Sequence, residues 1–330
     1  MSADMPRPVP MDRHPIALRN YVLPTPSIDA FCEKVQKCVR RRRPGLVVYA
    51  LPRFGKTYGI TYATAMLASE FPRLVVERFL ATPIIAHSEG RFYGDLNEAF
   101  GHKTPRTGDT GRRFDRLVHM LRKRVDGSGE GQLVIFIDEA QHLTLLEYKW
   151  LRGLTNALEK HDIRTVAILV GQHELRLQKD ALKNAGATDI VARFMLDEAK
   201  FSGLCSADDV MTCLDQYDQS TFPEDSDWSY TRYFFPRAWD NGLRLAASAS
   251  VVWQCFVEAG EAVQSPLGIE IPMDYFTRAI ETLFLDHSAA DTDLFSITPA
   301  MWTEAIMDSG YLQAYEEIIS EASRASSSHD

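Results

Sequence analysis

Apolar residues fall into five short runs along the first two-thirds of the chain, with longer mixed stretches between them. The runs predict strands at about 46–50, 74–80, 133–138, 165–170 and 194–200. Near-continuous apolar runs are typical of strands that are buried on both faces, as in a parallel sheet. The stretches between them predict helices, the first over about 28–42 with Ser27 as its N-cap. This alternation predicts an α/β fold with a five-stranded parallel sheet flanked by helices.

After Gly203 the pattern predicts helices alone. They span about 206–217, 241–260, 272–286 and 299–320. Residues 1–18 contain four prolines and few large apolar residues, which indicates a mobile arm. The predicted organisation is an arm and leading segment over 1–27, an α/β core over 28–203, a helical lid over 204–290, and a C-terminal helix and tail over 291–330.

Residues 50–57 read Ala-Leu-Pro-Arg-Phe-Gly-Lys-Thr and lie between the first predicted strand and a helical stretch. In such a loop a glycine lets the backbone approach phosphates, a lysine supplies positive charge, and a threonine offers a hydroxyl to Mg²⁺. Ala50 stands where this pattern has glycine, and because alanine rarely adopts a positive φ we expect an altered loop entrance. The loop predicts a site for ATP and Mg²⁺ formed by Ala50, Pro52, Arg53, Phe54, Gly55, Lys56, Thr57 and Tyr58.

Two carboxylates, Asp138 and Glu139, follow the apolar run of the third predicted strand. The carboxyl ends of parallel strands are where α/β sheets bind ligands. Asp138 is therefore predicted to hold Mg²⁺ together with Thr57, and Glu139 to orient and polarise the water that attacks ATP. The alternative interpretation is a strand that ends in a solvated acidic turn.

Three later polar residues extend this prediction. Gln172 follows the fourth predicted strand, and we expect it to contact the γ-phosphate or the attacking water unless it caps the next helix. Arg193 follows a helix and a loop, and we expect it to reach the nucleotide of a neighbouring subunit unless it forms a surface ion pair. Arg244 opens an Ala-rich helical stretch and is predicted to reach the γ-phosphate from the lid.

This order of features resembles that of the AAA+ ATPase family. Within the family the chain is similar to the TniB/TnsC transposition regulators, through Ile-Asp-Glu-Ala-Gln-His-Leu at 137–143, Leu-Val-Gly-Gln at 169–172 and Val-Ala-Arg-Phe at 191–194. Residues 92–125 match in layout, with a short helix, a basic loop and a second helix. In the AAA+ resemblance the segment 21–27 lies against the adenine.

The resemblance implies an ATPase that assembles with copies of itself, as a ring or a helical filament, on double-stranded DNA. It would link a target-selection protein to a transposase and hydrolyse ATP to disassemble, with no transposase chemistry of its own. Two other functions stay open. One is a helicase loader or replication-initiation ATPase, which an added DNA-binding domain would favour. The other is a nucleotide-gated switch with little turnover, against which Glu139 argues.

The distribution of charge adds a nucleic-acid prediction. The 330-residue chain has a net charge of −9, which disfavours non-specific coating of nucleic acid by the whole surface. Residues 101–125 nevertheless carry eight basic and two acidic residues. A row of cations neutralises phosphates with little regard to sequence, whereas the alternative is a solvated helix face. The predicted DNA contacts are Lys103, Thr104, Arg106, Arg112, Arg113, Arg116 and, from a later helix, Lys149.

Other features of the sequence indicate in which compartment the protein works and which partners it binds. No apolar run reaches the roughly 18 residues that cross a bilayer, so we expect no membrane partner. The polar, Pro-rich N-terminus is unlike a signal peptide, and five cysteines without a Cys-x-x-Cys pair are typical of a reduced, cytoplasmic protein. Six aromatic residues from Trp228 to Trp239 predict a cluster packed under a loop, or else a partner-binding surface.

Overall fold

The structure is a computed structural model that describes residues 7–83, 85–261 and 269–313. Packing divides the chain into two compact units. We call residues 30–51 and 56–201 the sheet unit, and residues 1–29, 52–55 and 202–330 the helical unit. The short segment 52–55 thus packs with the helical unit although both of its neighbours in sequence belong to the sheet unit.

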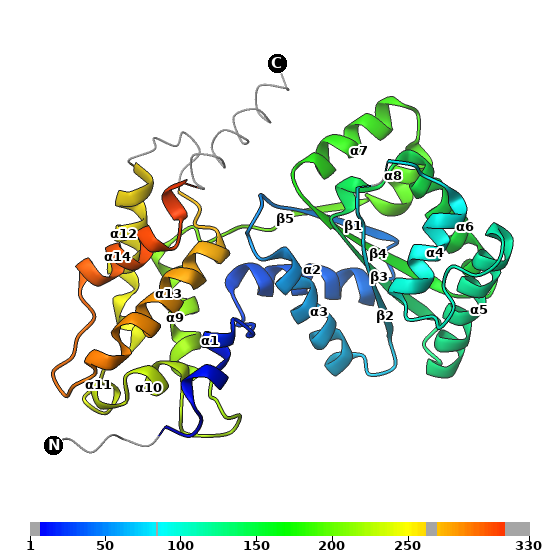
Figure 1. The fold of residues 1–330 in the computed structure, drawn as a ribbon. Helices are drawn as coiled ribbons and strands as arrows, with labels where there is room; N and C mark the ends of the chain where they lie inside the picture. The colour runs from blue at the N-terminus through cyan, green and yellow to red at the C-terminus, as the bar shows by residue number, and fades with distance from the viewer. Residues whose placement is uncertain (1–6, 84, 262–268, 314–330) are drawn as a thin grey trace. The chain divides into compact units, whose positions relative to one another are not determined.

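Five parallel strands form the sheet. They are β1 (Gly45–Tyr49), β2 (Val75–Leu80), β3 (Gln132–Asp138), β4 (Arg164–Gly171) and β5 (Asp197–Lys200). Their order across the sheet is β2-β3-β4-β1-β5, and every adjacent pair is parallel (Figure 1). All residues of β3 are buried, as expected for an interior strand. The predicted fold class is confirmed, and the bounds of β1–β4 agree with the prediction to within one residue.

The prediction for the fifth strand began too early. Residues up to Phe194 form a helix, α8 (Thr188–Phe194), and β5 begins only at Asp197. Phe194 is buried beside the start of β1, where a Cβ built on Gly45 would lie 2.3 Å from the Phe194 carbonyl oxygen. The apolar residue at 194 therefore belongs to a helix packed on the sheet, and only glycine at 45 allows this approach.

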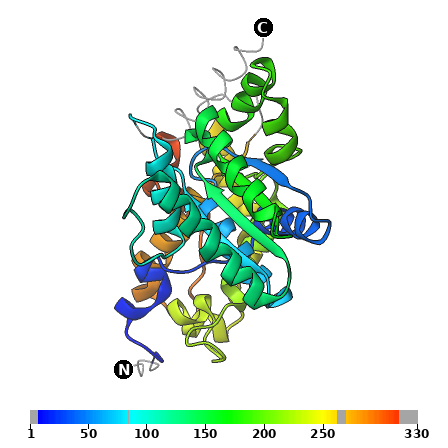
Figure 2. The same cartoon turned by 90° about the vertical axis from the view of Figure 1, so that its right-hand side faces the viewer.

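Helices cover both faces of the sheet. Besides α8 they are α2 (Pro26–Arg40), α3 (Lys56–Glu70), α4 (Glu89–Ala99), α5 (Thr110–Ser128), η2 (Ala140–His142), α6 (Leu145–Glu159) and α7 (Glu174–Asn184). Figures 1 and 2 show α2 and α3 on one face and α4, α5, α6 and α8 on the other. The layout predicted between the second and third strands, helix, basic loop and helix, is confirmed by α4 and α5.

The helical unit consists of short and medium helices. They are η1 (Met11–Arg13), α1 (Pro15–Leu18), α9 (Ala207–Gln219), α10 (Tyr230–Phe234), α11 (Pro236–Asp240), η3 (Leu245–Ser248), α12 (Ala249–Glu261), α13 (Met273–His287), η4 (Ser288–Ala290) and α14 (Pro299–Asp308). Among the described residues, no helix is both long and apolar enough to cross a membrane.

Two predicted helix bounds were wrong for local reasons. The helix expected from 241 begins at Leu245, after Gly242 turns the chain with a φ of 97°. The helix expected over 299–320 ends at Asp308, because Ser309 and Gly310 form a turn in which Gly310 has a φ of 82°. Its predicted continuation over 314–320, and the predicted tail, lie outside the described residues.

The cap predicted for the first long helix, Ser27, was two residues late. The hydroxyl of Thr25, rather than Ser27, accepts a hydrogen bond from the Ile28 backbone N–H at 3.2 Å, and α2 begins at Pro26. Threonine and proline together form a common helix start, because proline fits the first turn without losing a hydrogen bond.

The N-terminal segment was expected to be mobile, but its described part is packed. Within the helical unit His14 is fully buried among aromatic rings, with its ring centroid 4.2 Å from that of Tyr233. Burial lowers the pKa of His14 to about 4. The Tyr233 hydroxyl donates to the Val9 carbonyl at 2.7 Å, and the ring of Phe234 is also fully buried. The aromatic segment is thus core, as one of the two interpretations had it, and residues 7–18 cover it.

Candidate nucleotide-binding site

Lys56 is a buried cation at the start of α3, next to the carboxyl end of β1. Its Nζ donates to the Leu51 carbonyl at 3.1 Å and forms no ion pair with the described residues. Burial lowers the pKa of Lys56, and the nearby charges of Glu139 and Asp138 oppose that shift. A buried ammonium without a counter-ion is costly, so this position is suited to an anionic ligand.

Thr57 and Asp138 meet across the ends of α3 and β3. The Thr57 hydroxyl donates to Asp138 Oδ2 at 2.9 Å, and Asp138 Oδ1 accepts from the Glu139 backbone N–H at 3.0 Å. A hydroxyl and a carboxylate side by side, close to a lysine, are the oxygen ligands that Mg²⁺ prefers when it accompanies phosphates. The two predicted metal ligands are therefore neighbours, and their chemistry fits the ion.

Glu139 follows Asp138 in a left-handed backbone conformation, with a φ of 51°. Its Oε2 accepts from Gln172 Nε2 at 3.3 Å and from Gln141 Nε2 at 2.6 Å. The Gln172 side chain thus contacts the predicted water-orienting carboxylate instead of capping α7. Gln141 was not predicted as a site residue. Its sequence signal is only its place two residues after Glu139 at a strand end.

The phosphate loop differs from the expectation at its entrance. Ala50 is buried, and its N–H donates to the Gly171 carbonyl at 3.1 Å. Positive φ angles occur at Arg53 (65°) and Gly55 (90°), so the expected strain at Ala50 is absent. Replacing the pattern's glycine with alanine therefore costs the backbone nothing here, and the strained non-glycine residue is Arg53.

The loop segment 52–55 makes its contacts within the helical unit. Arg53 pairs with Asp274 at 2.8 Å, and its carbonyl accepts from the Asp274 N–H at 3.1 Å. Phe54 is buried, Pro52 is partly exposed, and Tyr58, further along on α3, is 52 % exposed. The N-terminus of α13 therefore holds the tip of the loop through Arg53.

The two predicted arginines have partners within their own units. Arg193 donates to Thr155 Oγ1 at 3.0 Å and forms an ion pair of 3.5 Å with Glu159 on α6. Arg244 donates to the Trp239 carbonyl at 3.1 Å and lies 3.6 Å from the centroid of that ring. Contact of Arg193 with a neighbouring subunit, and of Arg244 with a nucleotide, stay predictions.

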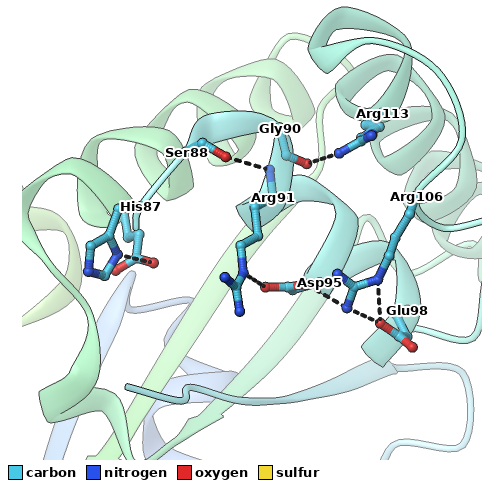
Figure 3. Close-up of polar contacts among 9 residues, drawn as sticks. His87, Ser88, Gly90, Arg91, Asp95, Glu98, Arg106 and Arg113 are labelled. Carbon is cyan, nitrogen blue, oxygen red and sulfur yellow. Dashed lines mark hydrogen bonds and ion pairs between the residues drawn. The ribbon is translucent and has the colours of Figure 1, made fainter. Parts of the chain in front are cut away.

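Residues 101–125, which lie between β2 and β3, are called the basic insertion below. Part of their positive charge is paired with carboxylates of α4. Figure 3 shows Arg106 against Glu98 and Asp95, at 2.5 and 2.9 Å, and Arg113 donating to the Gly90 carbonyl at 2.8 Å. Arg106, Asp95 and Glu98 also line a cavity of about 300 Å³ at the end of β2. These contacts stabilise the insertion, and contact of Arg106 and Arg113 with DNA phosphates stays a prediction.

Other predicted DNA contacts are more open. Arg116 donates to the carbonyl of Thr104 at 2.5 Å, so both of these residues take part in the fold of the insertion. Lys103 and Lys149 are exposed, and the ion pair of Arg112 with Asp109 is long, at 3.8 Å, and exposed on both sides. Lys103, Arg112 and Lys149 are therefore the cations most available to a phosphate backbone.

Comparison with known proteins agrees with this geometry. Residues 39–178 match the family model of an AAA domain. No curated protein matched the chain. Similar solved structures include the Aeropyrum pernix ORC2 protein in its ADPNP–ADP complexes, with 13 % identity, a TM-score of 0.57, and coverage of 90 % of this chain and 72 % of that one. Its ADP form has the same identity, a TM-score of 0.53, and coverage of 88 % and 71 %.

A weaker likeness, with a TM-score of 0.46 and 13 % identity, is to domain III of the Thermotoga maritima replication initiation protein DnaA, covering 93 % of this chain and 99 % of that one. The likeness to ORC2 concerns the fold, whereas the family match includes the phosphate loop and both strand-end carboxylates. The match of residues 39–178 to an AAA domain, together with the order of the parallel strands, shows that this part of the chain has the AAA+ P-loop fold.

Proposed function

We propose that this chain hydrolyses ATP at the carboxyl ends of β1, β3 and β4. The observation that carries the proposal is the convergence of a buried Lys56, which forms no ion pair with the described residues, with the Thr57–Asp138 pair and with Glu139. A triphosphate with its cation would supply the missing negative and positive charges at once.

In this proposal each site residue has a separate role in phosphate binding, metal binding or orientation of the water. Lys56 and the backbone N–H groups at the start of α3 bind the phosphates, and Thr57 with Asp138 holds Mg²⁺. When bound, Mg²⁺ neutralises charge that develops on the phosphate oxygens. Glu139 orients and polarises the attacking water. Gln172, whose Nε2 lies 3.3 Å from Glu139 Oε2, adds a hydrogen-bond donor near the same water.

We further propose that the chain binds double-stranded DNA without sequence preference, assembles on it, and regulates transposition. The support is the exposed set of Lys103, Arg112 and Lys149 on the sheet unit, together with the resemblance of the sequence motifs to those of TniB/TnsC regulators. In this proposal the partners are a transposase and a target-selection protein. Arg193 of one subunit completes the site of the next, and head-to-tail contacts of this kind form a ring or a filament.

A replication-initiation or helicase-loading role would use the same nucleotide site, so chemistry at Glu139 does not separate the two functions. Assembly separates the proposed regulator from a helicase loader, because a regulator of the proposed kind forms oligomers on bare DNA, whereas a loader needs the motor that it loads.

The test is electron microscopy of the purified protein with double-stranded DNA, with and without a non-hydrolysable ATP analogue. Phosphate release from ATP is measured in parallel, with Mg²⁺ and with excess chelator. Rings or filaments that need nucleotide and increase with DNA support the assembly proposal, and monomers under every condition contradict it. Phosphate release that needs Mg²⁺ supports the ATPase proposal, and its absence with and without DNA contradicts it.

A further inference from the structure

The carboxylate of Glu139 is held from one side only. Both of its hydrogen bonds from described side chains, from Gln141 and Gln172, go to Oε2. Oε1 accepts none from the described residues. An oxygen held by two donors fixes the plane of the carboxylate, and the other oxygen is left to accept from water.

Gln141 can hold Glu139 in only one orientation of its amide. Its Oε1 accepts from the Gln172 backbone N–H at 3.1 Å, while its Nε2 donates to Glu139 at 2.6 Å. A flipped amide would place an oxygen against the carboxylate and an NH₂ group against an N–H, and both contacts would be repulsive. The side chain therefore bridges the end of β3 to the residue that follows β4.

The end of β4 is shaped to receive this amide. A Cβ built on Gly171 would lie 2.4 Å from Gln141 Oε1, and Gly171 does not have a positive φ. Glycine at 171 is therefore needed to leave space for the Gln141 side chain, not to allow an unusual backbone conformation. An alanine at 171 fits the strand conformation but displaces the end of a flexible side chain.

A second glutamine anchors the short helix that contains Gln141. Gln178 on α7 donates from Nε2 to the Leu143 carbonyl, and its Oε1 accepts from the buried Tyr148 hydroxyl at 3.0 Å. Burial raises the pKa of Tyr148, which keeps its hydroxyl protonated as a donor. The chain from Tyr148 through Gln178 fixes η2 in place, and with it the strained left-handed backbone at Glu139.

We propose that Gln141 is the positioning residue of this site, holding Oε2 of Glu139 against the end of β4 so that Oε1 faces the attacking water. The inference deepens the proposed ATPase function and rests on it for its catalytic consequence. The contact itself is a property of the chain without nucleotide, and it can be tested separately.

The catalytic test compares steady-state ATP hydrolysis and nucleotide affinity for Gln141→Ala, Gly171→Ala and the control Gln254→Ala. Gln254 is an exposed glutamine that also donates to a carboxylate, Glu258, on α12. We expect kcat to fall roughly 10- to 100-fold in the first two variants, as for other residues that orient a catalytic group. Nucleotide affinity should stay within about twofold, because no phosphate contact is removed.

Gln141→Glu distinguishes donation from packing. The new side chain has the same size and can still accept from Gln172 N–H, but as a carboxylate it repels Glu139. Two adjacent carboxyls share a proton as the pH falls, and the protonated one is a donor again. We expect its deficit relative to the unmodified protein to shrink at lower pH, whereas the deficit of Gln141→Ala stays constant. Equal pH profiles for the two variants would overturn the positioning role.

The contact is tested without activity by NMR of the nucleotide-free protein labelled with ¹⁵N at glutamine. The side-chain NH₂ signals of Gln141, assigned by their loss in Gln141→Ala, should move in Glu139→Ala and in Gly171→Ala. Those of Gln254 should not move. Unmoved Gln141 signals overturn the proposal even if ATP is hydrolysed. Signals that move in a protein with no hydrolysis uphold the contact and overturn the proposed function instead.

Discussion

Charged side chains gather in two parts of the sheet unit, and the two parts differ in how those charges are paired. At the nucleotide-binding site Lys56 is buried and, among the residues that the structure describes, bonds only a backbone carbonyl, while Thr57 bonds Asp138. In the basic insertion Arg106 is 57 % exposed and already bonded to two carboxylates. Among the described residues, burial without an ion pair therefore occurs where a ligand is expected, and exposure with ion pairs occurs where the fold itself needs the charge.

The difference has an energetic reason. Removing a charge from water costs several kcal/mol unless an opposite charge replaces the lost hydration. A buried lysine without an ion pair therefore binds an anion strongly, because the anion offsets this cost. An exposed ion pair contributes only about 0–1 kcal/mol, and its arginine gains little by exchanging a carboxylate for a phosphate. A count of basic residues in a sequence therefore overestimates the charge available to DNA, and a single lysine in a phosphate loop is a stronger signal.

The largest expected effect is that of Lys56→Ala. It removes the unpaired cation, and losing charged hydrogen bonds worth about 3 kcal/mol weakens ATP binding about 100-fold. Nucleotide affinity measured by titration with a fluorescent ATP analogue checks this, and nucleotide-dependent assembly should disappear with it. Lys149→Ala is the matched control for nucleotide affinity, since Lys149 is an exposed lysine on α6. Equal affinities of the Lys56 and Lys149 variants for the ATP analogue would contradict the proposed difference between the two regions.

Arg193→Ala tests whether a paired arginine can also serve a nucleotide site. If Arg193 completes the site of a neighbouring subunit, hydrolysis in the assembled state should fall about 10³-fold while nucleotide binding by the monomer is unchanged. Glu159→Gln breaks the same ion pair but keeps the arginine, so it should leave hydrolysis intact or raise it. A comparable loss in both variants would show that the pair matters for stability alone.

Glu139→Gln should separate binding from chemistry. The variant keeps the size of the side chain but removes the charge that accepts a proton from water, so we expect hydrolysis to fall about 100-fold. ATP binding should be preserved and oligomers should persist after ATP is added, which light scattering over time can follow. Normal turnover would remove Glu139 from the mechanism and leave its contacts with Gln141 and Gln172 as structure only.

The fold and the first members of the site could be predicted because their signals are local. Buried strands are continuous apolar runs, and the phosphate loop with its strand-end carboxylates occupies short segments of fixed spacing. The bridge through Gln141 could not be predicted, since it depends on Gly171, 30 positions away, leaving space for an amide. The packing of residues 7–18 on the aromatic segment also joins parts that are distant in sequence.

Which cations of the insertion are free could not be predicted for the same reason. Arg106 and Lys103 are both basic residues in one loop, and nothing within that loop shows that Glu98 and Asp95, on α4, pair with the first and leave the second exposed. Their partners are set by how α4 and the loop pack together. The two side chains therefore provide the smallest and most discriminating test of the comparison.

Lys103→Ala and Arg106→Ala should have opposite phenotypes. If Lys103 contacts a phosphate, its loss should weaken binding to double-stranded DNA of any sequence and lower the slope of log affinity against log salt by about 0.9. Arg106→Ala should leave that slope unchanged, because the arginine is bonded to carboxylates at 2.5 and 2.9 Å, and should lower the free energy of unfolding by less than about 1 kcal/mol. Fluorescence anisotropy over a salt series, with thermal unfolding of the same samples, measures both quantities. A reduced slope for Arg106→Ala with an unchanged one for Lys103→Ala would mean that phosphates displace the carboxylates. The contrast between paired and unpaired charge would then fail in this insertion.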